Sequence, residues 1–328
     1  MNENKRKGTY LRRGLGVCLA LLLTVSLTTP AFALFKKDKQ AASTAAEGAP
    51  IAQNLELATY EDIPITGTFT SVAEGAVTYA LQTEPKNGSV TIEEGTANFK
   101  YIPKEGKTGK DAFAYVAINN DGQVSTPAQV TVTIKKNKSK VTYEDMTDSA
   151  AHAAAICLAE NGVFTGCRVG DDYFFSPDET VSRSEFLAMA MKATGVKKLD
   201  QVTMTGFCDD GAIPTWAKSY ASAALKAGII DGVSTTEGVA FDASSAITLG
   251  EAATIMNRIL DVTNVVSPGP MERDQAMANL QSVGVISAGC FGSSTTETPL
   301  KRSDAAQILA AAIGVTHEEK PGLLDWLK

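Results

Sequence analysis

Residues 87–122 read NGSVTIEEGTANFKYIPKEGKTGKDAFAYVAINNDG, and their apolar side chains recur at every second position. Phe99 and Tyr101 form one such pair, and Phe113 and Tyr115 form another. A period of two places each pair on one face of a β-strand. Short runs of Asn, Asp and Gly separate the pairs and supply the residues that tight turns need. The stretch therefore predicts a series of antiparallel strands.

The same alternation extends over residues 49–134, a length that suits one β-sandwich of roughly seven strands. In these residues the chain resembles the bacterial Ig-like, cadherin-like repeats of surface proteins. Related repeats often carry an acidic loop that suggests calcium binding, but the matching residues 71–76 hold a single carboxylate, Glu74. Calcium takes six to eight oxygen ligands, so we predict no metal site here and interpret Asp111 and Asp121 as turn residues.

Beyond residue 141 the apolar period becomes helical, and the chain repeats itself. Residues 162–166 (GVFTG) match residues 228–232 (GIIDG), and the pentads 181–185 (VSRSE) and 247–251 (ITLGE) follow them at equal spacing, which gives a period of 66 residues. A weaker third copy has GVI at 284–286 and LKRSD at 300–304. We interpret each unit as a helix, a Gly-rich turn, a loop and a second helix.

The pentads predict where the second helix of each repeat begins. Ser182 with Glu185, and Thr248 with Glu251, have the spacing of capping boxes. Arg183 is unusual there, because the first turn of a helix disfavours a cation by ~0.3 to 1 kcal/mol. An anionic ligand held by the guanidinium and the free N–H groups of the helix start is one explanation. An ion pair with Asp178 or Glu179 is the other, and the residues alone leave both open.

The motif order in this region resembles the S-layer homology (SLH) family, whose signature runs F-x-D, W-A-x-x-Y, G-I-I-x-G, F-x-P and I-T-R-A-E. The second repeat carries versions of these motifs at residues 207–209, 216–220, 228–232, 241–243 and 247–251. The resemblance implies an all-α three-repeat SLH domain with pseudo-threefold symmetry, following the all-β Ig-like sandwich. It also implies binding of secondary cell-wall polysaccharide, often through a pyruvylated sugar, in grooves between the repeats.

The resemblance also nominates site residues. It implies that the arginine of the I-T-R-A-E motif, here Arg183 and Arg302, holds the ligand's carboxylate and that Trp216 stacks on a sugar. Asp145 and Asp209 belong to the F-x-D motifs and are further candidates for polysaccharide binding, with helix-entry caps as the alternative. Trp216 has a plain core role as its alternative.

The repeats also depart from the family pattern. Leu249 stands where the second repeat should have its arginine, and Ala150 and Glu272 stand where the other repeats should have a tryptophan. We therefore expect at most two binding grooves, those of Arg183 and Arg302.

The N-terminus has the features of a secretory signal peptide. Five basic residues precede an apolar run, and Ala31 and Ala33 frame a cleavage site. Cleavage after Ala33 leaves 25 basic and 36 acidic residues, a formal net charge of −11. We expect no integral membrane segment after cleavage and, from the acidic charge, no nucleic-acid partner.

These observations divide the chain as follows: signal peptide 1–33, flexible spacer 34–48, bacterial Ig-like β-sandwich 49–134, Lys-rich linker 135–140, SLH repeat 1 at 141–198, SLH repeat 2 at 203–264, degenerate SLH repeat 3 at 268–315 and C-terminal tail 316–328. Four cysteines remain after cleavage, none in a C-x-x-C pair, and we favour small, buried, unpaired thiols over disulfides or zinc ligands.

The predicted function is non-covalent anchoring of a secreted bacterial surface protein to cell-wall polysaccharide, with the Ig-like domain as a spacer or adhesive module. No cofactor is expected. An enzyme is not expected either, because the two histidines, His152 and His317, lack partners at motif spacing. The alternatives are an adhesin or S-layer component whose Ig-like domain binds a partner, with self-association in a surface layer left open, and a glycosidase that uses two carboxylates.

Overall fold

The structure is a computed structural model and describes residues 48–72, 77–147, 149–263, 272–286, 291–292 and 294–318. The expected signal peptide, all of the spacer but Gly48, the loop residues 73–76, Cys290 and the last ten residues of the tail lie outside the described residues.

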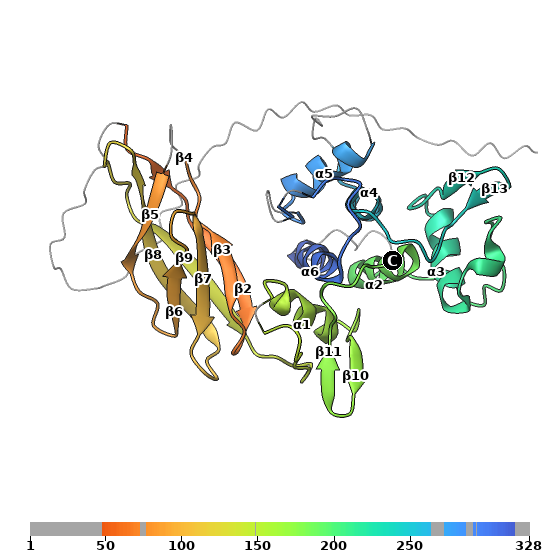
Figure 1. Ribbon diagram of the computed structural model, residues 1–328, viewed down its shortest axis with the longest axis horizontal. Helices are drawn as coiled ribbons and strands as arrows, with labels where there is room; N and C mark the ends of the chain where they lie inside the picture. The colour runs from red at the N-terminus through yellow and green to blue at the C-terminus, as the bar shows by residue number, and fades with distance from the viewer. Residues whose placement is uncertain are drawn as a thin grey trace, which may run out of the picture. The chain divides into compact units, whose positions relative to one another are not determined.

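The N-terminal part is a β-sandwich with a four-stranded sheet in the order β2-β9-β8-β5 and a three-stranded sheet in the order β3-β7-β6 (Figure 1). Strand β2 runs parallel to β9, and the other neighbours in both sheets are antiparallel. The strands are β1 (Ile51–Ala52), β2 (Leu55–Tyr60), β3 (Ile65–Thr68), β4 (Ser71–Val72), β5 (Val77–Thr83), β6 (Gly88–Ile92), β7 (Asn98–Pro103), β8 (Gly109–Asn119) and β9 (Ala128–Lys135).

The sandwich core contains the aromatic pairs that the alternation singled out. Phe99, Tyr101, Phe113 and Tyr115 are all buried in one cluster, which confirms the period-two prediction. Asp111 is not a turn residue: it lies buried in β8 and accepts hydrogen bonds from the backbone N–H groups of residues 86 and 87 and from the Tyr101 hydroxyl. The turn prediction failed because the groups that satisfy the buried Asp111 carboxylate are distant in sequence, and a local turn pattern cannot reveal them.

The C-terminal part contains helices and two short hairpins. Its elements are α1 (His152–Glu160), β10 (Cys167–Val169), β11 (Asp172–Phe174), α2 (Arg183–Thr194), the 3₁₀ turn η1 (Asp210–Ala212), α3 (Thr215–Lys226), β12 (Val233–Thr235), β13 (Gly238–Ala240), α4 (Leu249–Leu260), α5 (Glu272–Ser282) and α6 (Arg302–Glu318).

The prediction of an all-α three-repeat SLH domain with pseudo-threefold symmetry is wrong. Strands β10 and β11 pair antiparallel, and so do β12 and β13, in segments that the sequence analysis interpreted as loops (Figure 1). Each hairpin begins directly after a glycine with positive φ, Gly166 or Gly232, where a Cβ would lie 2.3 Å from the Phe174 oxygen or 2.7 Å from the Ala240 oxygen. The glycines allow this close approach of the second strand, so the fold is mixed α and β.

The capping boxes are confirmed. The Ser182 hydroxyl accepts a hydrogen bond from the Glu185 N–H, and the Glu185 carboxylate accepts one from the Ser182 N–H; Thr248 and Glu251 are paired in the same way. Helices α2 and α4 therefore begin where the local sequence predicts.

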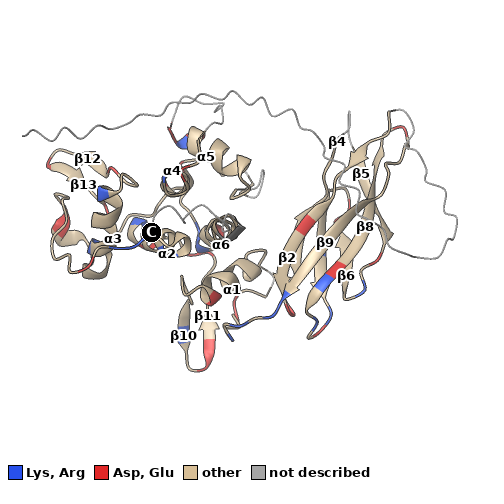
Figure 2. Ribbon diagram, turned by 180° about the vertical axis from the view of Figure 1, so that it is seen from behind, with Lys and Arg blue, Asp and Glu red and all other residues tan. Residues whose placement is uncertain are grey.

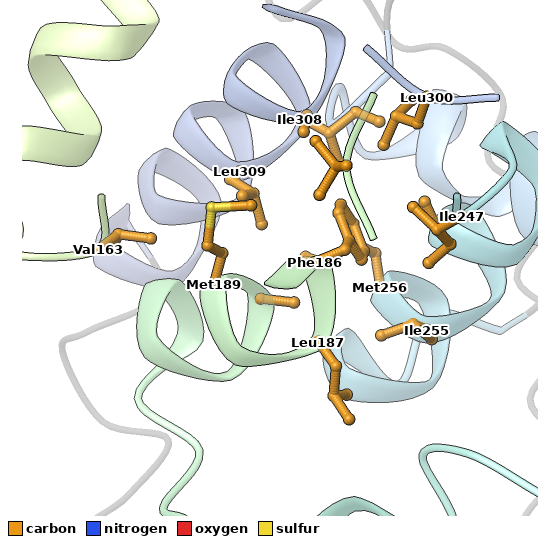
Figure 3. Packing of buried hydrophobic residues seen from close by; sticks show 14 of the residues in the cluster. Val163, Phe186, Leu187, Met189, Ile247, Ile255, Met256, Leu300, Ile308 and Leu309 are labelled. Atoms are coloured by element: carbon orange, nitrogen blue, oxygen red, sulfur yellow. The ribbon is translucent and has the colours of Figure 1, made fainter. Parts of the chain in front are cut away.

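Backbone hydrogen bonds link the three segments in front of α2, α4 and α6 into a closed circuit. Val181 N–H donates to the Leu300 oxygen, Leu300 N–H to the Ile247 oxygen, and Ile247 N–H to the Val181 oxygen, at 2.8 to 3.0 Å. These three residues are buried, and side chains of α2, α4 and α6 meet around them (Figure 3). Each helix start is thus positioned by residues of another repeat.

The three described cysteines, Cys157, Cys167 and Cys208, are free thiols, as expected. Cys167 and Cys208 are exposed, so the prediction of buried thiols is wrong for these two. Both lie on or beside the hairpins, whose short strands cover little of their neighbours.

Candidate functional site

Arg183 occupies the first helical position of α2 and is 8% exposed. Its Nε donates to the Phe241 oxygen at 3.0 Å, and its Nη1 lies 3.0 Å from Glu251 Oε1. The anion that balances this cation is therefore a protein carboxylate, but neither Asp178 nor Glu179. The partner comes from the first turn of α4, because the second repeat packs against the start of α2.

Arg302 occupies the same position at the start of α6. Its Nη1 donates to the Phe175 oxygen at 2.8 Å, and its Nη2 lies 2.7 Å from Glu179 Oε2. The guanidinium carbon also lies 5.3 Å from the centre of the Phe164 ring, within cation–π range. The Glu179 side chain is 63% exposed, so this ion pair faces solvent.

Trp216 and Arg302 line one cavity of about 150 Å³, although 85 residues separate them in the chain. Phe164 and, from α2, Met189 and Lys192 complete much of its wall. Trp216 is 49% exposed, so it is not a plain core residue. The cavity combines an accessible indole, a guanidinium and an ammonium with one carboxylate, Glu185, whose Oε2 accepts hydrogen bonds from Ser182 in the capping box of α2. The two cations and the indole suit a ligand with both an apolar face and a negative charge.

A second cavity of about 470 Å³ lies beside Arg183 and contains charged residues that the sequence analysis missed. Arg258 pairs with Asp231 and with Glu272, each at 2.7 Å, and Arg273 pairs with Glu297 and approaches Glu251. These carboxylates raise the pKa of both arginines against the opposing effect of burial. No motif spacing marks these residues, because the partners lie 14 to 27 residues apart in sequence, and Arg258–Glu272 and Arg273–Glu251 join different repeats. Every arginine of this cavity already has a protein carboxylate beside it.

Asp145 and Asp209 hold equivalent loops in the first and second repeats. Asp145 accepts hydrogen bonds from the backbone N–H groups of Phe175 and Ser176, and Asp209 accepts them from residues 241 and 242, at 2.6 to 2.9 Å. Neither carboxylate caps a helix by these bonds. Instead each carboxylate holds a loop whose phenylalanine backbone oxygen accepts a hydrogen bond from an arginine side chain. Asp145 holds the loop of Phe175, the residue that accepts from Arg302, and so helps to position Arg302 indirectly.

His152, the first residue of α1, is buried with no hydrogen-bond partner for either ring nitrogen among the described residues. The Tyr143 ring lies 6.3 Å from the imidazole ring, centre to centre, and its hydroxyl also lacks a partner there. Burial lowers the pKa of His152, an effect that the nearby Met146 backbone and the charge of Asp145 partly oppose. Burial therefore favours the neutral imidazole over the charged one.

In the described part of the chain, none of the helices combines the length and apolar character of a membrane-spanning helix. The same residues contain no cluster of three or more His, Cys, Asp or Glu side chains arranged to hold a metal ion.

Comparison with known families identifies the sandwich. Residues 47–135 match the family described as Bacterial Ig domain, so the N-terminal part of this chain is a bacterial Ig-like domain. Over 135 residues the chain is also 30% identical to a protein named Exoglucanase XynX from Acetivibrio thermocellus. That alignment covers 40% of this chain and 12% of the relative, so the chain spans only a small part of the curated protein it matches.

Two solved structures illustrate the structural likeness. The fibronectin(III)-like modules of Clostridium thermocellum CbhA are 16% identical with a TM-score of 0.18, covering 26% of this chain and 98% of that one. The sialic acid binding region of a Streptococcus sanguinis adhesin is 14% identical with a TM-score of 0.20, covering 29% of this chain and 31% of that one. Scores this low carry no argument about function.

Proposed function

We propose that this chain is an exported bacterial surface protein and that residues 141–315 hold it on an anionic cell-wall polysaccharide. The observation that carries the proposal is the cavity that Trp216 and Arg302 share. Both residues were candidates from the same motif resemblance, and they come from different segments of the chain. In this proposal the Ig-like domain is the spacer or adhesive module that the anchor displays.

The chemistry of the cavity fits a charged sugar. An indole face stacks on the apolar face of a pyranose ring, as amphipathic aromatic residues do at interfaces with one wet side. A guanidinium binds a carboxylate or phosphate through two parallel hydrogen bonds, and charge-assisted bonds of this kind are about twice as strong as neutral ones. A pyruvyl group on the sugar would supply such a carboxylate.

The Arg302–Glu179 pair does not block this role. An ion pair with a largely exposed partner contributes only about 0 to 1 kcal/mol, so a ligand anion can share or replace Glu179 at small cost. Arg302 also keeps its bond to the Phe175 oxygen, which holds the guanidinium in place without neutralising it. The glutamate beside Arg183 is only 22% exposed, so a ligand cannot replace it in the same way. We therefore propose that Arg183 holds the first two repeats together.

The test is binding of the full chain to purified cell-wall sacculi, with and without their polysaccharide. We expect Arg302→Gln to weaken binding by about 1.5 to 3 kcal/mol, the range of a lost charge-assisted hydrogen bond, and Trp216→Ala to weaken it by about 0.5 to 1.5 kcal/mol, the range of a lost ring contact. Met204→Ala is the matched control, because Met204 is also an exposed apolar residue but does not line the cavity. Full binding by the double variant Trp216→Ala/Arg302→Gln would refute the proposal.

A glycosidase is the second candidate, favoured by a cavity of about 480 Å³ that Glu144, Asp145 and Asp178 help to line. Two carboxylates suffice for glycoside hydrolysis. We place it second because Asp145 is committed to two backbone N–H groups and Asp178 pairs with Lys301 at 2.8 Å. Release of reducing sugar from purified wall polysaccharide, abolished in Glu144→Gln, would reverse this order.

A further inference from the structure

The lysines of the Ig-like domain are unevenly distributed. Residues 47–135 contain six lysines and eleven Asp or Glu residues, so the domain is acidic as a whole. Yet every one of these lysines except Lys100 lies in a loop or strand terminus at one end of the sandwich: Lys86, Lys104, Lys107, Lys110 and Lys135. Lys136, Lys138 and Lys140 continue the series in the linker.

The strand register brings these residues together. Gly88 at the start of β6 pairs with Pro103 at the end of β7, and Gly109 at the start of β8 pairs with Ile134 near the end of β9. The two sheets are joined at this end because Asp111 of β8 holds the backbone N–H groups of residues 86 and 87. We call the eight lysines at 86, 104, 107, 110, 135, 136, 138 and 140 the lysine end.

The positive charge of the lysine end is not balanced by ion pairs. All eight side chains are exposed, and none makes an ion pair within the described residues. Three carboxylates, Glu84, Glu105 and Asp111, lie in the segments that carry these lysines. Three more, Glu61, Asp62 and Glu160, accept hydrogen bonds from the backbone N–H groups of residues 137, 106 and 138. Eight lysines against six carboxylates leave a formal charge of 8 − 6 = +2 at this end of a domain that is acidic as a whole. Figure 2 shows Lys and Arg positions on the loops at the β9 end of the sandwich.

We infer that the lysine end binds a polyanionic wall polymer, a chain that carries phosphate or carboxylate groups at regular intervals. Several exposed ammonium groups on adjoining loops lie within one Debye length, about 8 Å at physiological salt, of a polymer that runs across them. Such binding needs no pocket, because each contact is a lysine with one anionic group. The site is separate from the Trp216–Arg302 cavity; it rests on the proposed location at the cell wall but not on binding by that cavity.

Composition favours a wall polymer over a nucleic acid. The segments 84–87, 104–111 and 135–140 that carry the lysines read EPKN, KEGKTGKD and KKNKSK, with no aromatic residue and no arginine. Single-stranded nucleic acids are bound by aromatic stacking platforms, and bases in duplexes are most often read by arginine. A surface of lysine alone can recognise repeated charge but little else.

The test uses the full chain with soluble polyglycerol phosphate and, as a carboxylate probe, polygalacturonate. Lys104→Gln/Lys107→Gln is compared with Lys197→Gln/Lys226→Gln, which removes the same charge from exposed positions of the helical part. For the first variant we expect roughly tenfold weaker binding to at least one probe and a fall of about two in the slope of log K against log salt, one per lost contact. The second variant should bind as the parent does.

Equal losses in the two variants, or no loss in the first, would overturn the inference. Tighter binding to a DNA duplex than to either probe would overturn the choice of a wall polymer. Trp216→Ala should leave binding to polyglycerol phosphate unchanged, because this polymer has no sugar ring on which the indole could stack, and this separates the site from the proposed anchor. Binding to polyglycerol phosphate alone would identify phosphate as the recognised group, and binding to polygalacturonate alone would identify carboxylate.

Discussion

The starts of α2 and α6 carry the same motif arginine in two different environments. Arg183 and Arg302 both donate to the backbone oxygen of a phenylalanine in another repeat, and both pair with a glutamate. The glutamates differ: the side chain of Glu251 is 22% exposed and completes the capping box of α4, whereas that of Glu179 is 63% exposed. The anion beside Arg183 is therefore part of the fold, and the one beside Arg302 is replaceable.

The residues around Arg183 and Arg302 differ in the same way as their partners do. Arg302 shares its cavity with a half-exposed tryptophan, whereas the cavity beside Arg183 is lined by further arginines with their own carboxylates. A motif residue thus braces two repeats in one place and faces an open cavity in the other. Two predictions test this division, and a third concerns the buried His152.

The largest effect is expected from Arg183→Ala. Removing Arg183 takes away the closer cationic partner of Glu251 and leaves only Arg273, at 3.6 Å, so the free energy of unfolding should fall by at most about 3 kcal/mol, as measured by urea denaturation. Adding Glu251→Gln should recover part of this loss. An unchanged denaturation midpoint with weaker binding to sacculi would show that Arg183 is a ligand residue like Arg302.

Asp145→Ala and Asp209→Ala should each lower the free energy of unfolding by about 2 kcal/mol, because each leaves two backbone N–H groups without their charged acceptor. Their effects on binding to sacculi should differ. Only Asp145 holds the loop whose Phe175 oxygen positions Arg302, so only Asp145→Ala should weaken binding. Equal binding losses in the two variants would contradict the comparison.

The smallest effect concerns pH. Because burial lowers the pKa of His152, the unfolded state binds a proton more readily than the folded state. The stabilising contribution of neutral His152 is present above its unfolded pKa of about 6.5 and is lost as pH falls below that value. The melting temperature should therefore drop between pH 7 and pH 5 by more in the parent than in His152→Gln. Parallel curves for the two proteins would exclude His152 as a source of acid sensitivity.

Local features of this molecule were predictable from the sequence. The alternation around Phe99 and Phe113 determines which strand faces are buried, because successive side chains of a strand point to opposite sides. The capping boxes of Ser182 and Thr248 mark two helix starts, because their partners lie three residues away. The family-level identity of the sandwich followed from the same stretch of turns and strands, and it is confirmed over residues 47–135.

The features that distinguish one site from another were decided by tertiary structure. The hairpins after Gly166 and Gly232 are too short to show a period, so the sequence analysis interpreted them as loops and the all-α prediction failed. Glu251 lies 68 residues from Arg183, and Trp216 reaches the cavity of Arg302 because α3 packs against α2, whose side chains line the same cavity. Motif spacing specifies residues along the chain, whereas the partner of a buried charge is set by which repeat packs against it.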